Sequence, residues 1–331
     1  MSHFPPEIQG EKLTPPHHPG LGLVRVTEAA ALTAGRWMGL DAASDADHAA
    51  QDAMAAALNL LPMRGTIISG EEGRLHEATP LTSGSSIGAG EGPEMDVELN
   101  AIDGAGLVSE GVPGAISVAA LAPRGTMWDP GPAVYLEKLV VDSDVAPHIG
   151  PEALDAPPAW TLALVARHKK KEIRDLVVFV LKRKRHEKLI EEIRRSGARV
   201  FLRGDGDVAG ALMAGYRGGE VDVLMGIGGS AEGLAAACAV KVMGGEILGR
   251  IAPQSESEKA ACAEAGLDTG KILRCEDLVR GDSMYFSATG ITDSVILDGV
   301  HYHGSIVTTH SLVLRYETQT RREIKTEHRL K

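Results

Sequence analysis

The stretch Met95–Gly106, MDVELNAIDGAG, decides most of what can be read from this sequence. Its first part, Asp96–Leu99, favours a β-strand, and Asn100–Gly104 then combines glycine with oxygen-bearing side chains in a turn. The stretch Gly65–Glu72, GTIISGEE, repeats this design and ends in glycine and two glutamates. Adjacent strands of this kind would aim their carboxylates into one cleft. Oxygen ligands suit Mg²⁺ and Mn²⁺, and Mg²⁺ is commonly held by few carboxylates plus substrate phosphate, so we predict a reaction centre here.

Size and charge limit the classes of protein to consider. The 331 residues are 44% hydrophobic, which is enough to bury a large core, and the length predicts two domains. A net charge of −11 argues against general nucleic-acid binding, because such binding depends on neutralising phosphates.

Apolar runs such as Ala115–Ala122 are far shorter than the roughly 20 residues of a membrane-spanning helix. The N-terminal Met1–Gly20 lacks the apolar core of a signal peptide, and we expect a mobile arm there.

The cysteines Cys238, Cys262 and Cys275 are few, odd in number and without Cys-x-x-Cys spacing. This usage fits a reduced, cytoplasmic setting and does not fit a zinc cluster.

The first half of the chain predicts two Ala-rich helices followed by strands. The helices are expected at Leu23–Arg36 and Asp45–Leu61, the second ending before Pro62. Asp47 lies in the first turns of the second helix, where it either complements the helix N-terminus or faces a metal ion. Four β-type runs separated by turns then follow, at Gly65–Ser69, Asp96–Leu99, Ala115–Ala122 and Val134–Val141.

A change of pattern at Ala156-Pro157-Pro158 marks an expected domain boundary. Beyond it, helical and apolar strand segments alternate, which predicts a largely parallel sheet covered on both faces. The last strands, Ser283–Ile291 and Val307–Tyr316, are candidates for antiparallel pairing, with a turn at His301–His303 between them. The alternating segments are, in order, helix Trp160–Lys170, strand Leu176–Leu181, helix Glu187–Arg195, strand Arg199–Leu202, helix Val208–Gly215, strand Asp222–Met225, helix Ser230–Met243 and strand Glu246–Ile251.

Three chemically different turns follow the strands of this second half. They are the basic turn Lys182–His186, the acidic turn Gly204–Asp207 and the glycine-rich turn Ile227–Gly233. Ligands bind beyond the carboxyl ends of strands in such sheets, so we expect the turns to meet in one crevice. A sugar phosphate needs Arg or Lys for its phosphate, carboxylates for its hydroxyls and open backbone N–H groups. The acidic turn is equally compatible with a simple turn and helix cap.

Other conspicuous segments have plainer interpretations. The run Lys169–Lys171 follows a helix and is expected on a solvated face. Gly226–Gly229 matches a dinucleotide-binding fingerprint only weakly, because no acidic residue ends the next strand. Tyr135, taken by itself, is more often a core residue than a ligand.

Nine segments spread over the chain together carry a family resemblance: TEAAALTAGRWMG, GTIISGE, DVELNAIDGA, YLEKLVV, RKRHEKLIEEIRRSGARV, GDGDVAGAL, MGIGGSAEGLAAACAVKVMGG, ATGITDSVILDGV and TTHSLVLR. From about Leu23 to His328 the sequence resembles class II fructose-1,6-bisphosphatases, members of the inositol-monophosphatase-like, lithium-sensitive phosphatase superfamily. The resemblance implies an α/β protein with a two-domain, layered α/β/α/β/α sugar phosphatase fold and mixed sheets. It implies an N-terminal metal-binding phosphatase domain at residues 21–157 and a C-terminal α/β domain at 158–331 that completes the substrate site.

The same resemblance implies an activity. Class II fructose-1,6-bisphosphatases are metal-dependent phosphomonoester hydrolases of gluconeogenesis that convert fructose 1,6-bisphosphate to fructose 6-phosphate. Some relatives also act on sedoheptulose 1,7-bisphosphate. The implied cofactor is Mn²⁺ or Mg²⁺, the implied partner is a small sugar bisphosphate rather than nucleic acid or a membrane, and the implied assembly is a homodimer or homotetramer.

The family motifs assign roles to individual residues. Asp47 and Glu71 match ligands of one metal ion, and Asn100, Asp103 and Glu232 match positions for a second. The implied catalytic residues are Asp47, Glu71, Asp103 and Glu232. The positions that match substrate contacts are Asp103, Gly104, Ala105, Tyr135, Arg183, Lys184, Arg185, Asp205, Gly206, Asp207 and Gly229.

The sequence departs from the family pattern at several of these positions. Asn100 replaces a metal-binding aspartate, and Ala105 replaces a threonine whose hydroxyl helps to place the attacking water. A lysine has become Ala43, and Ala231 stands where the family has proline. An uncharged amide should bind the second metal more weakly, and loss of the hydroxyl should cost roughly 10²-fold in rate. The hypothesis is therefore a fructose-1,6-bisphosphatase of reduced activity, and the alternative is a catalytically impaired, sugar-phosphate-binding paralogue with a regulatory role.

Overall fold

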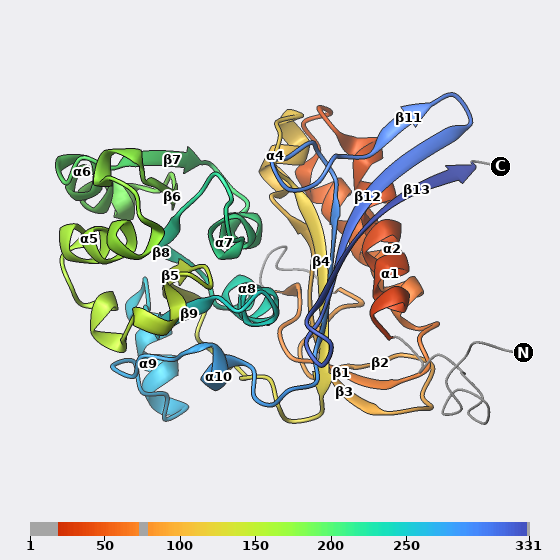
Figure 1. Cartoon of the computed structure of the whole chain (residues 1–331). Helices are drawn as coiled ribbons and strands as arrows, with labels where there is room; N and C mark the ends of the chain where they lie inside the picture. Colours follow the sequence, from red (N-terminus) through yellow and green to blue (C-terminus); the bar gives the residue numbers. More distant parts are fainter. Residues whose placement is uncertain (1–18, 73–78, 330–331) are drawn as a thin grey trace, which may run out of the picture.

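The computed structural model describes residues 19–72 and 79–329, which form five alternating layers of helices and sheets. Figure 1 shows two sheets side by side, with helices between them and over both outer faces. This arrangement confirms the predicted layered α/β/α/β/α fold with mixed sheets. The expected N-terminal arm lies outside the described residues except for positions 19 and 20, which belong to the first helix.

The larger sheet has eight strands in the order β11-β12-β10-β4-β3-β1-β2, with β13 paired to β12. Only the β1–β3 pair is parallel among the described strands of this sheet. The chain therefore returns to the N-terminal strands at its C-terminal end. The strands are β1 (Arg64–Ile67), β2 (Ser86–Ile87), β3 (Glu94–Asp103), β4 (Ile116–Pro123), β10 (Tyr285–Gly290), β11 (His301–His303), β12 (Ile306–Arg315) and β13 (Thr320–Arg329).

The smaller sheet has five strands in the order β7-β6-β8-β5-β9. Strands β6, β7 and β8 are parallel to one another, as the alternating pattern predicts. Strand β5 runs antiparallel to both β8 and β9, so the prediction of a largely parallel sheet is wrong on that side. The strands are β5 (Tyr135–Val141), β6 (Val177–Leu181), β7 (Arg199–Arg203), β8 (Val223–Gly229) and β9 (Glu246–Ile251).

Each face of the two sheets packs against a pair of helices. Helices α1 (Pro19–Ala34) and α2 (Ala43–Leu58) cover the outer face of the larger sheet, and α5 (Pro158–Lys169) and α6 (Glu187–Arg195) cover that of the smaller one. Between the sheets lie α7 (Asp207–Gly215) and α8 (Ser230–Val242). The other described helices are η2 (Gly35–Trp37), α4 (Ala105–Glu110), η3 (Ala146–His148), η4 (Pro151–Leu154), η5 (Ile173–Asp175), η6 (Lys184–His186), α9 (Glu256–Glu264) and α10 (Cys275–Leu278).

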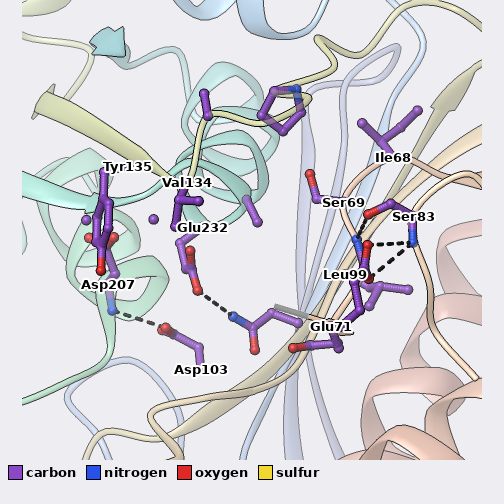
Figure 2. Close-up of a pocket in the computed structure, with 18 of the residues that line it drawn as sticks. Ile68, Ser69, Glu71, Ser83, Leu99, Asp103, Val134, Tyr135, Asp207 and Glu232 are labelled. Atoms are coloured by element: carbon purple, nitrogen blue, oxygen red, sulfur yellow. Dashed lines mark hydrogen bonds between the residues drawn. The ribbon is translucent and has the colours of Figure 1, made fainter. Parts of the chain in front are cut away.

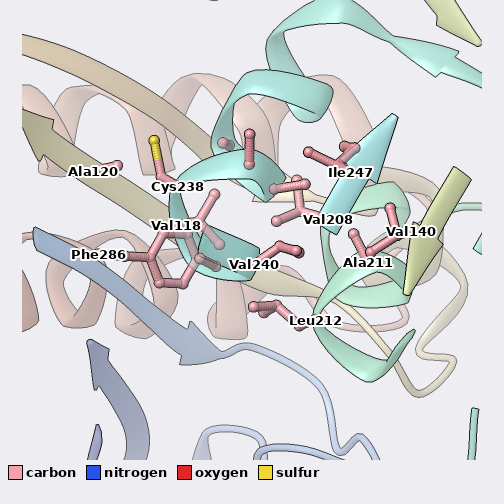
Figure 3. Packing of buried hydrophobic residues seen from close by; sticks show 14 of the residues in the cluster. Val118, Ala120, Val140, Val208, Ala211, Leu212, Cys238, Val240, Ile247 and Phe286 are labelled. Carbon is pink, nitrogen blue, oxygen red and sulfur yellow. The ribbon is translucent and has the colours of Figure 1, made fainter. Parts of the chain in front are cut away.

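The core between the sheets explains why α8 is rich in alanine. Figure 3 shows Cys238 and Val240 of α8 among side chains of both sheets, including Val118 and Ile247. A helix covered on both sides must keep small side chains so that the sheets can approach it. Close approach also restricts α7, where a Cβ on Gly210 would lie 2.4 Å from the Phe179 ring. The two middle helices thus fix the spacing of the layers.

Several local predictions need correction. Strand β3 continues through Asn100 to Asp103 with an irregularity in its pairing, so the predicted turn after Leu99 starts only at Gly104. His301–His303 forms strand β11 rather than a turn. The glycine run Gly226–Gly229 is likewise part of β8 and pairs with β5. Strand β13 was missed because its residues are mostly charged, as expected for a strand at the edge of a sheet.

Lys169 also contradicts its prediction of a solvated position. Its ammonium lies 2.7 Å from the Asp142 carboxylate and 3.2 Å from that of Asp222, and all three side chains are buried. Lys171 completes this network at 2.7 Å from Asp222. Lys169 and Lys171 therefore anchor the end of α5 to the sheet, whereas Lys170 is exposed as predicted.

The division of the chain into domains at residue 157 stays a prediction. The sheets themselves follow another partition, because residues 64–123 and 285–329 supply the larger sheet and residues 135–251 supply the smaller one. Among the described residues, no helix has both the length and the apolarity to cross a bilayer.

Candidate active site

A cleft of about 1090 Å³ opens between the two sheets and is lined by residues from both. Nearly all predicted site residues line it, although they are spread over almost two hundred positions of the sequence. The exceptions are Lys184, which is exposed in η6, and Gly206, which is buried at the start of α7. The predicted residues on its walls are Asp47, Glu71, Asn100, Asp103, Gly104, Ala105, Tyr135, Arg183, Arg185, Asp205, Asp207, Gly229 and Glu232.

The end of β3 brings the larger sheet into contact with both middle helices. Asn100 donates from Nδ2 to Oε1 of Glu232 over 3.4 Å, at the first turn of α8. The Asp103 carboxylate accepts the backbone N–H groups of Asp207 and Ala209 at 3.1 and 2.9 Å. The helix N-terminus favours such an anion. Figure 2 shows the hydrogen bond between the Asp207 backbone and Asp103, with Glu232 nearby.

Burial opposes the charge that these carboxylates carry. The pKa of Asp103 is raised well above its usual value, first by burial and then by the negative charge of Asp205. The pKa of Asp207 is also raised by burial, and the ammonium of Lys138 acts in the opposite direction. A cation entering the cleft would offset this cost, because a nearby positive charge favours the ionised form of a carboxylate.

The acidic wall of the cleft is completed from β1 and α2. Glu71 follows β1, and its Oε1 accepts the backbone N–H of Ala101 at 2.8 Å, which ties it to β3. Asp47 lies on the buried face of α2 and lines the same wall. Glu72 also lines the cleft, and its carboxylate accepts the Ser83 N–H at 3.2 Å. The sequence left Asp47 either at the helix N-terminus or at a metal, and its role as a metal ligand stays a prediction.

The opposite wall is basic and aromatic. Arg183 precedes η6 and Arg185 lies within it, and the Arg185 guanidinium lies 4.9 Å from the centre of the Tyr135 ring. Arg183 donates to the backbone oxygen of Gly204 and lies 3.8 Å from the Asp205 carboxylate. The three turns expected at the carboxyl ends of β6, β7 and β8 therefore do meet in one cleft. Tyr135 is a cleft residue rather than a core residue.

Two buried residues that support this cleft were missed from the sequence. Lys138 on β5 forms a buried ion pair with Asp207, and it also donates to the Gly229 oxygen at 3.1 Å. Glu258 on α9 accepts the backbone N–H groups of Val134 and Tyr135 at 2.8 and 3.0 Å. The sequence did contain a signal for Lys138, because this lysine lies inside the apolar strand segment YLEKLVV. A lysine is almost never fully buried without a partner, so its place there indicates an acidic partner.

The donor set of the acidic wall suits a hard divalent cation. Within residues 19–72 and 79–329, no three His, Cys, Asp or Glu side chains meet closely enough to enclose an ion by themselves. Mg²⁺ does not need such a cage, since it usually keeps several waters and binds one or two carboxylates plus substrate phosphate. Oδ1 of Asn100 is buried and has no hydrogen-bond partner among the described residues. An unsatisfied buried oxygen beside carboxylates fits a place that a cation or its water would fill.

Comparison with known proteins identifies the family. The sequence matches the family described as bacterial fructose-1,6-bisphosphatase, glpX-encoded, over residues 18–328. The chain belongs to this family. It is 38% identical over 319 residues to the class 2 fructose-1,6-bisphosphatase of Haemophilus influenzae, covering 92% of this chain and 94% of the relative. It is 36% identical over 319 residues to fructose-1,6-bisphosphatase 1 class 2 of Escherichia coli strain K12, with the same coverage.

Membership of the fructose-1,6-bisphosphatase family confirms the resemblance drawn from the sequence. Both conspicuous departures from the expected family motif, Asn100 and Ala105, line the cleft. They therefore alter the site itself and not a distant surface.

Proposed function

We propose that this protein hydrolyses the 1-phosphate ester of fructose 1,6-bisphosphate to give fructose 6-phosphate and inorganic phosphate. The observation that carries the proposal is the division of one cleft into an acidic wall around Asn100 and Glu232 and a basic wall around Arg183 and Arg185. A sugar with two phosphates matches this division, with one phosphate at each wall. The relatives named class 2 fructose-1,6-bisphosphatase support the choice of substrate.

The acidic wall is the proposed reaction centre, with Mn²⁺ or Mg²⁺ as its cofactor. Asp47 and Glu71 would hold one ion, and Asn100, Asp103 and Glu232 would hold a second. When bound, such ions polarise the phosphoryl oxygens, lower the pKa of a bound water and stabilise the leaving oxygen. Water adds to phosphorus, the bond from phosphorus to the C1 oxygen breaks, and that oxygen takes up a proton. Catalysis of this kind depends on positioning and charge stabilisation.

The basic wall is the proposed binding site for the phosphate that stays on the sugar. Arg183 and Arg185 supply guanidinium groups, which suit phosphate because they can donate two hydrogen bonds at once. Asp205 lies between the walls and would accept hydroxyl groups of the sugar. A glycine at position 229 leaves room for the Glu232 carboxylate, since a Cβ there would collide with it, and we propose the Gly229 backbone as a substrate contact. We also propose roles for Gly104, Ala105, Tyr135, Lys184, Gly206 and Asp207 as substrate contacts.

The remaining proposals concern setting and assembly. Free, buried thiols at Cys238, Cys262 and Cys275 support a reducing cytoplasmic compartment. We propose a homodimer or homotetramer and, as the family resemblance implies, sedoheptulose 1,7-bisphosphate as a second substrate.

The test is a phosphate-release assay on fructose 1,6-bisphosphate with Mn²⁺ or Mg²⁺. The protein should release phosphate, and Glu232→Ala should lose at least about 10²-fold of that rate because it removes a group beside the transferred phosphoryl. Glu220→Ala removes an exposed acid elsewhere and should leave the rate unchanged. Circular dichroism checks that each variant is folded. Binding of the bisphosphate by calorimetry without turnover above Glu232→Ala would reject hydrolysis and favour the regulatory, sugar-phosphate-binding alternative.

A further inference from the structure

His186 is a buried histidine beside the basic wall of the cleft that the proposed reaction does not use. It ends the short helix η6 and leads into α6, and its ring is almost fully covered. Nδ1 lies 2.7 Å from the backbone oxygen of Leu181, at the end of β6. Nε2 lies 2.8 Å from the backbone nitrogen of Ile227, on β8. One ring therefore links the arginine-bearing turn to the ends of two neighbouring parallel strands.

These two contacts determine the protonation state of the ring. The backbone N–H of Ile227 can only donate, so Nε2 must offer its lone pair. The Leu181 oxygen can only accept, so Nδ1 must carry the hydrogen. A neutral imidazole with hydrogen on Nδ1 satisfies both partners, whereas a protonated ring would turn two donors toward each other at Nε2.

Ile227 connects this ring to the guanidinium groups of the cleft. Its N–H donates to His186, and its oxygen accepts Nη2 of Arg185 at 3.0 Å. The same guanidinium lies over the Tyr135 ring in the cleft wall. The position of Arg185 is thus defined by a strand residue that His186 holds in place.

The backbone of β8 passes close to the His186 ring. Gly226 precedes Ile227 with a φ of +140°, and a Cβ there would lie 3.1 Å from two atoms of the imidazole. A glycine is therefore required for the strand to pass the ring at this distance. The charged groups facing the ring are Arg185 and Arg183 from its own turn and Asp207 from α7.

We propose that neutral His186 is a positioning residue that fixes the arginine-bearing turn for the substrate phosphate that is not cleaved. The inference rests on the proposed function for the identity of the substrate. Protonation of the ring would break its bond to Ile227 and add a cation beside two arginines. The lowered pKa of His186, caused mainly by burial and also by the charges of Arg185 and Arg183, keeps the ring neutral near pH 7.

The test compares two substitutions of His186. His186→Gln retains a donor and an acceptor but cannot titrate, whereas His186→Leu removes both hydrogen bonds at similar volume. We expect His186→Leu to raise KM for fructose 1,6-bisphosphate roughly tenfold with kcat little changed, and His186→Gln to keep KM near the wild-type value at pH 8. His168→Gln is the control, because His168 also has a lowered pKa but lies outside the cleft.

The pH profile separates positioning from a merely structural role. The ratio of wild-type KM to the His186→Gln KM should stay flat through the usual histidine pKa and rise only at lower pH, because burial lowers the pKa of the wild-type ring and the glutamine cannot protonate. Titration of the substrate phosphate and of the other side chains cancels in this ratio. A ratio that stays flat down to the lowest pH at which both proteins remain folded, or a folded His186→Leu with wild-type KM, would overturn the proposal. If His186→Leu does not fold, the ratio alone decides.

A binding measurement keeps this inference separate from the proposed hydrolysis. Fructose 6-phosphate carries only the phosphate assigned to the basic wall, so its Kd by calorimetry needs no turnover. Weaker binding to His186→Leu supports the inference even if the wild-type protein hydrolyses nothing. Equal Kd values for the wild type and His186→Leu reject it even if hydrolysis is found.

Discussion

Asn100 on β3 donates a hydrogen bond from Nδ2 to Oε1 of Glu232 on α8, over 3.4 Å and across 132 positions of sequence. An aspartate is expected at position 100 from the family motif, and two carboxylates at this distance would repel each other unless a cation lay between them. The Asn100 amide therefore links β3 to α8 by a hydrogen bond. With the aspartate of the family motif, the same contact would depend on a bound metal ion. This relationship makes the metal response of the site testable.

Asn100→Asp should make the stability of the protein depend on divalent cation. In EDTA its Tm should fall below that of the wild type, because Glu232 then faces a second negative charge. With Mn²⁺ the order should reverse, and Kd for Mn²⁺ should tighten tenfold or more, which is about 1.4 kcal/mol. Thermal melts and calorimetry measure both effects. Asn59→Asp, at the only other asparagine of the sequence, adds the same charge outside the cleft and should show neither effect.

Ala105→Thr should raise the turnover of Asn100→Asp. Ala105 is the first residue of α4 and lines the cleft, so a hydroxyl there would lie beside the reaction centre. Together the two substitutions should increase kcat by roughly 10²-fold, and by more than the product of the single effects, because groups that act as a unit are not additive. Steady-state kinetics of the two single variants and the double variant form the cycle. Equal kcat in all of them contradicts the idea that these two residues limit the rate.

Lys138→Met should be strongly destabilising. It leaves the Asp207 carboxylate buried without its ammonium partner, which costs about 3–5 kcal/mol for a buried ion pair. The free energy of unfolding in urea measures the loss. Lys271→Met breaks an exposed pair with Asp277 and should cost only about 0–1 kcal/mol. Similar losses for the two variants argue against an uncompensated charge as the cause.

Lys169→Met should destabilise the protein far more than the same change at its neighbour. Lys169 is buried between Asp142 and Asp222, so its loss leaves Asp142 without a cation and should cost about 3–5 kcal/mol. Lys170 is exposed, and Lys170→Met should change stability by no more than about 0.5 kcal/mol. Each variant removes one positive charge, and the two positions are consecutive in the sequence. The two lysines differ in burial and in the ion pairs that Lys169 forms, and urea titration at one pH compares the two variants directly.

His186→Gln should reduce the loss of stability in acid. The pKa of His186 is lowered in the folded protein, chiefly by burial, whereas an unfolded histidine has a pKa of about 6.5. Below about pH 6.5 the unfolded chain therefore binds the proton first, and stability falls as pH falls. The glutamine variant lacks this contribution, so the two curves of unfolding free energy from pH 5 to 8 should diverge toward low pH. Parallel curves would show that His186 titrates normally.

Local pattern predicted most elements of the fold. Helix α6 at Glu187–Arg195 and strand β9 at Glu246–Ile251 have the predicted bounds, because apolar periodicity and turn residues lie within the segments themselves. The same pattern failed for β13, whose charged residues resemble a surface loop, and for Lys169, whose acidic partners are distant in sequence. A buried charge carries no local signal when its partner lies on another element.

The sequence by itself determined the chemical groups available to the site and the strands and helices that carry them. Tertiary structure alone decided that β10 and β12 return to pair with the N-terminal sheet and that β5 runs antiparallel to β8. It also decided that Asn100 meets Glu232 and that His186 reaches Ile227. The physical reason is that strand pairing and side-chain contacts join residues far apart in the chain, and the free energy of each contact depends on both partners and on the packing around them.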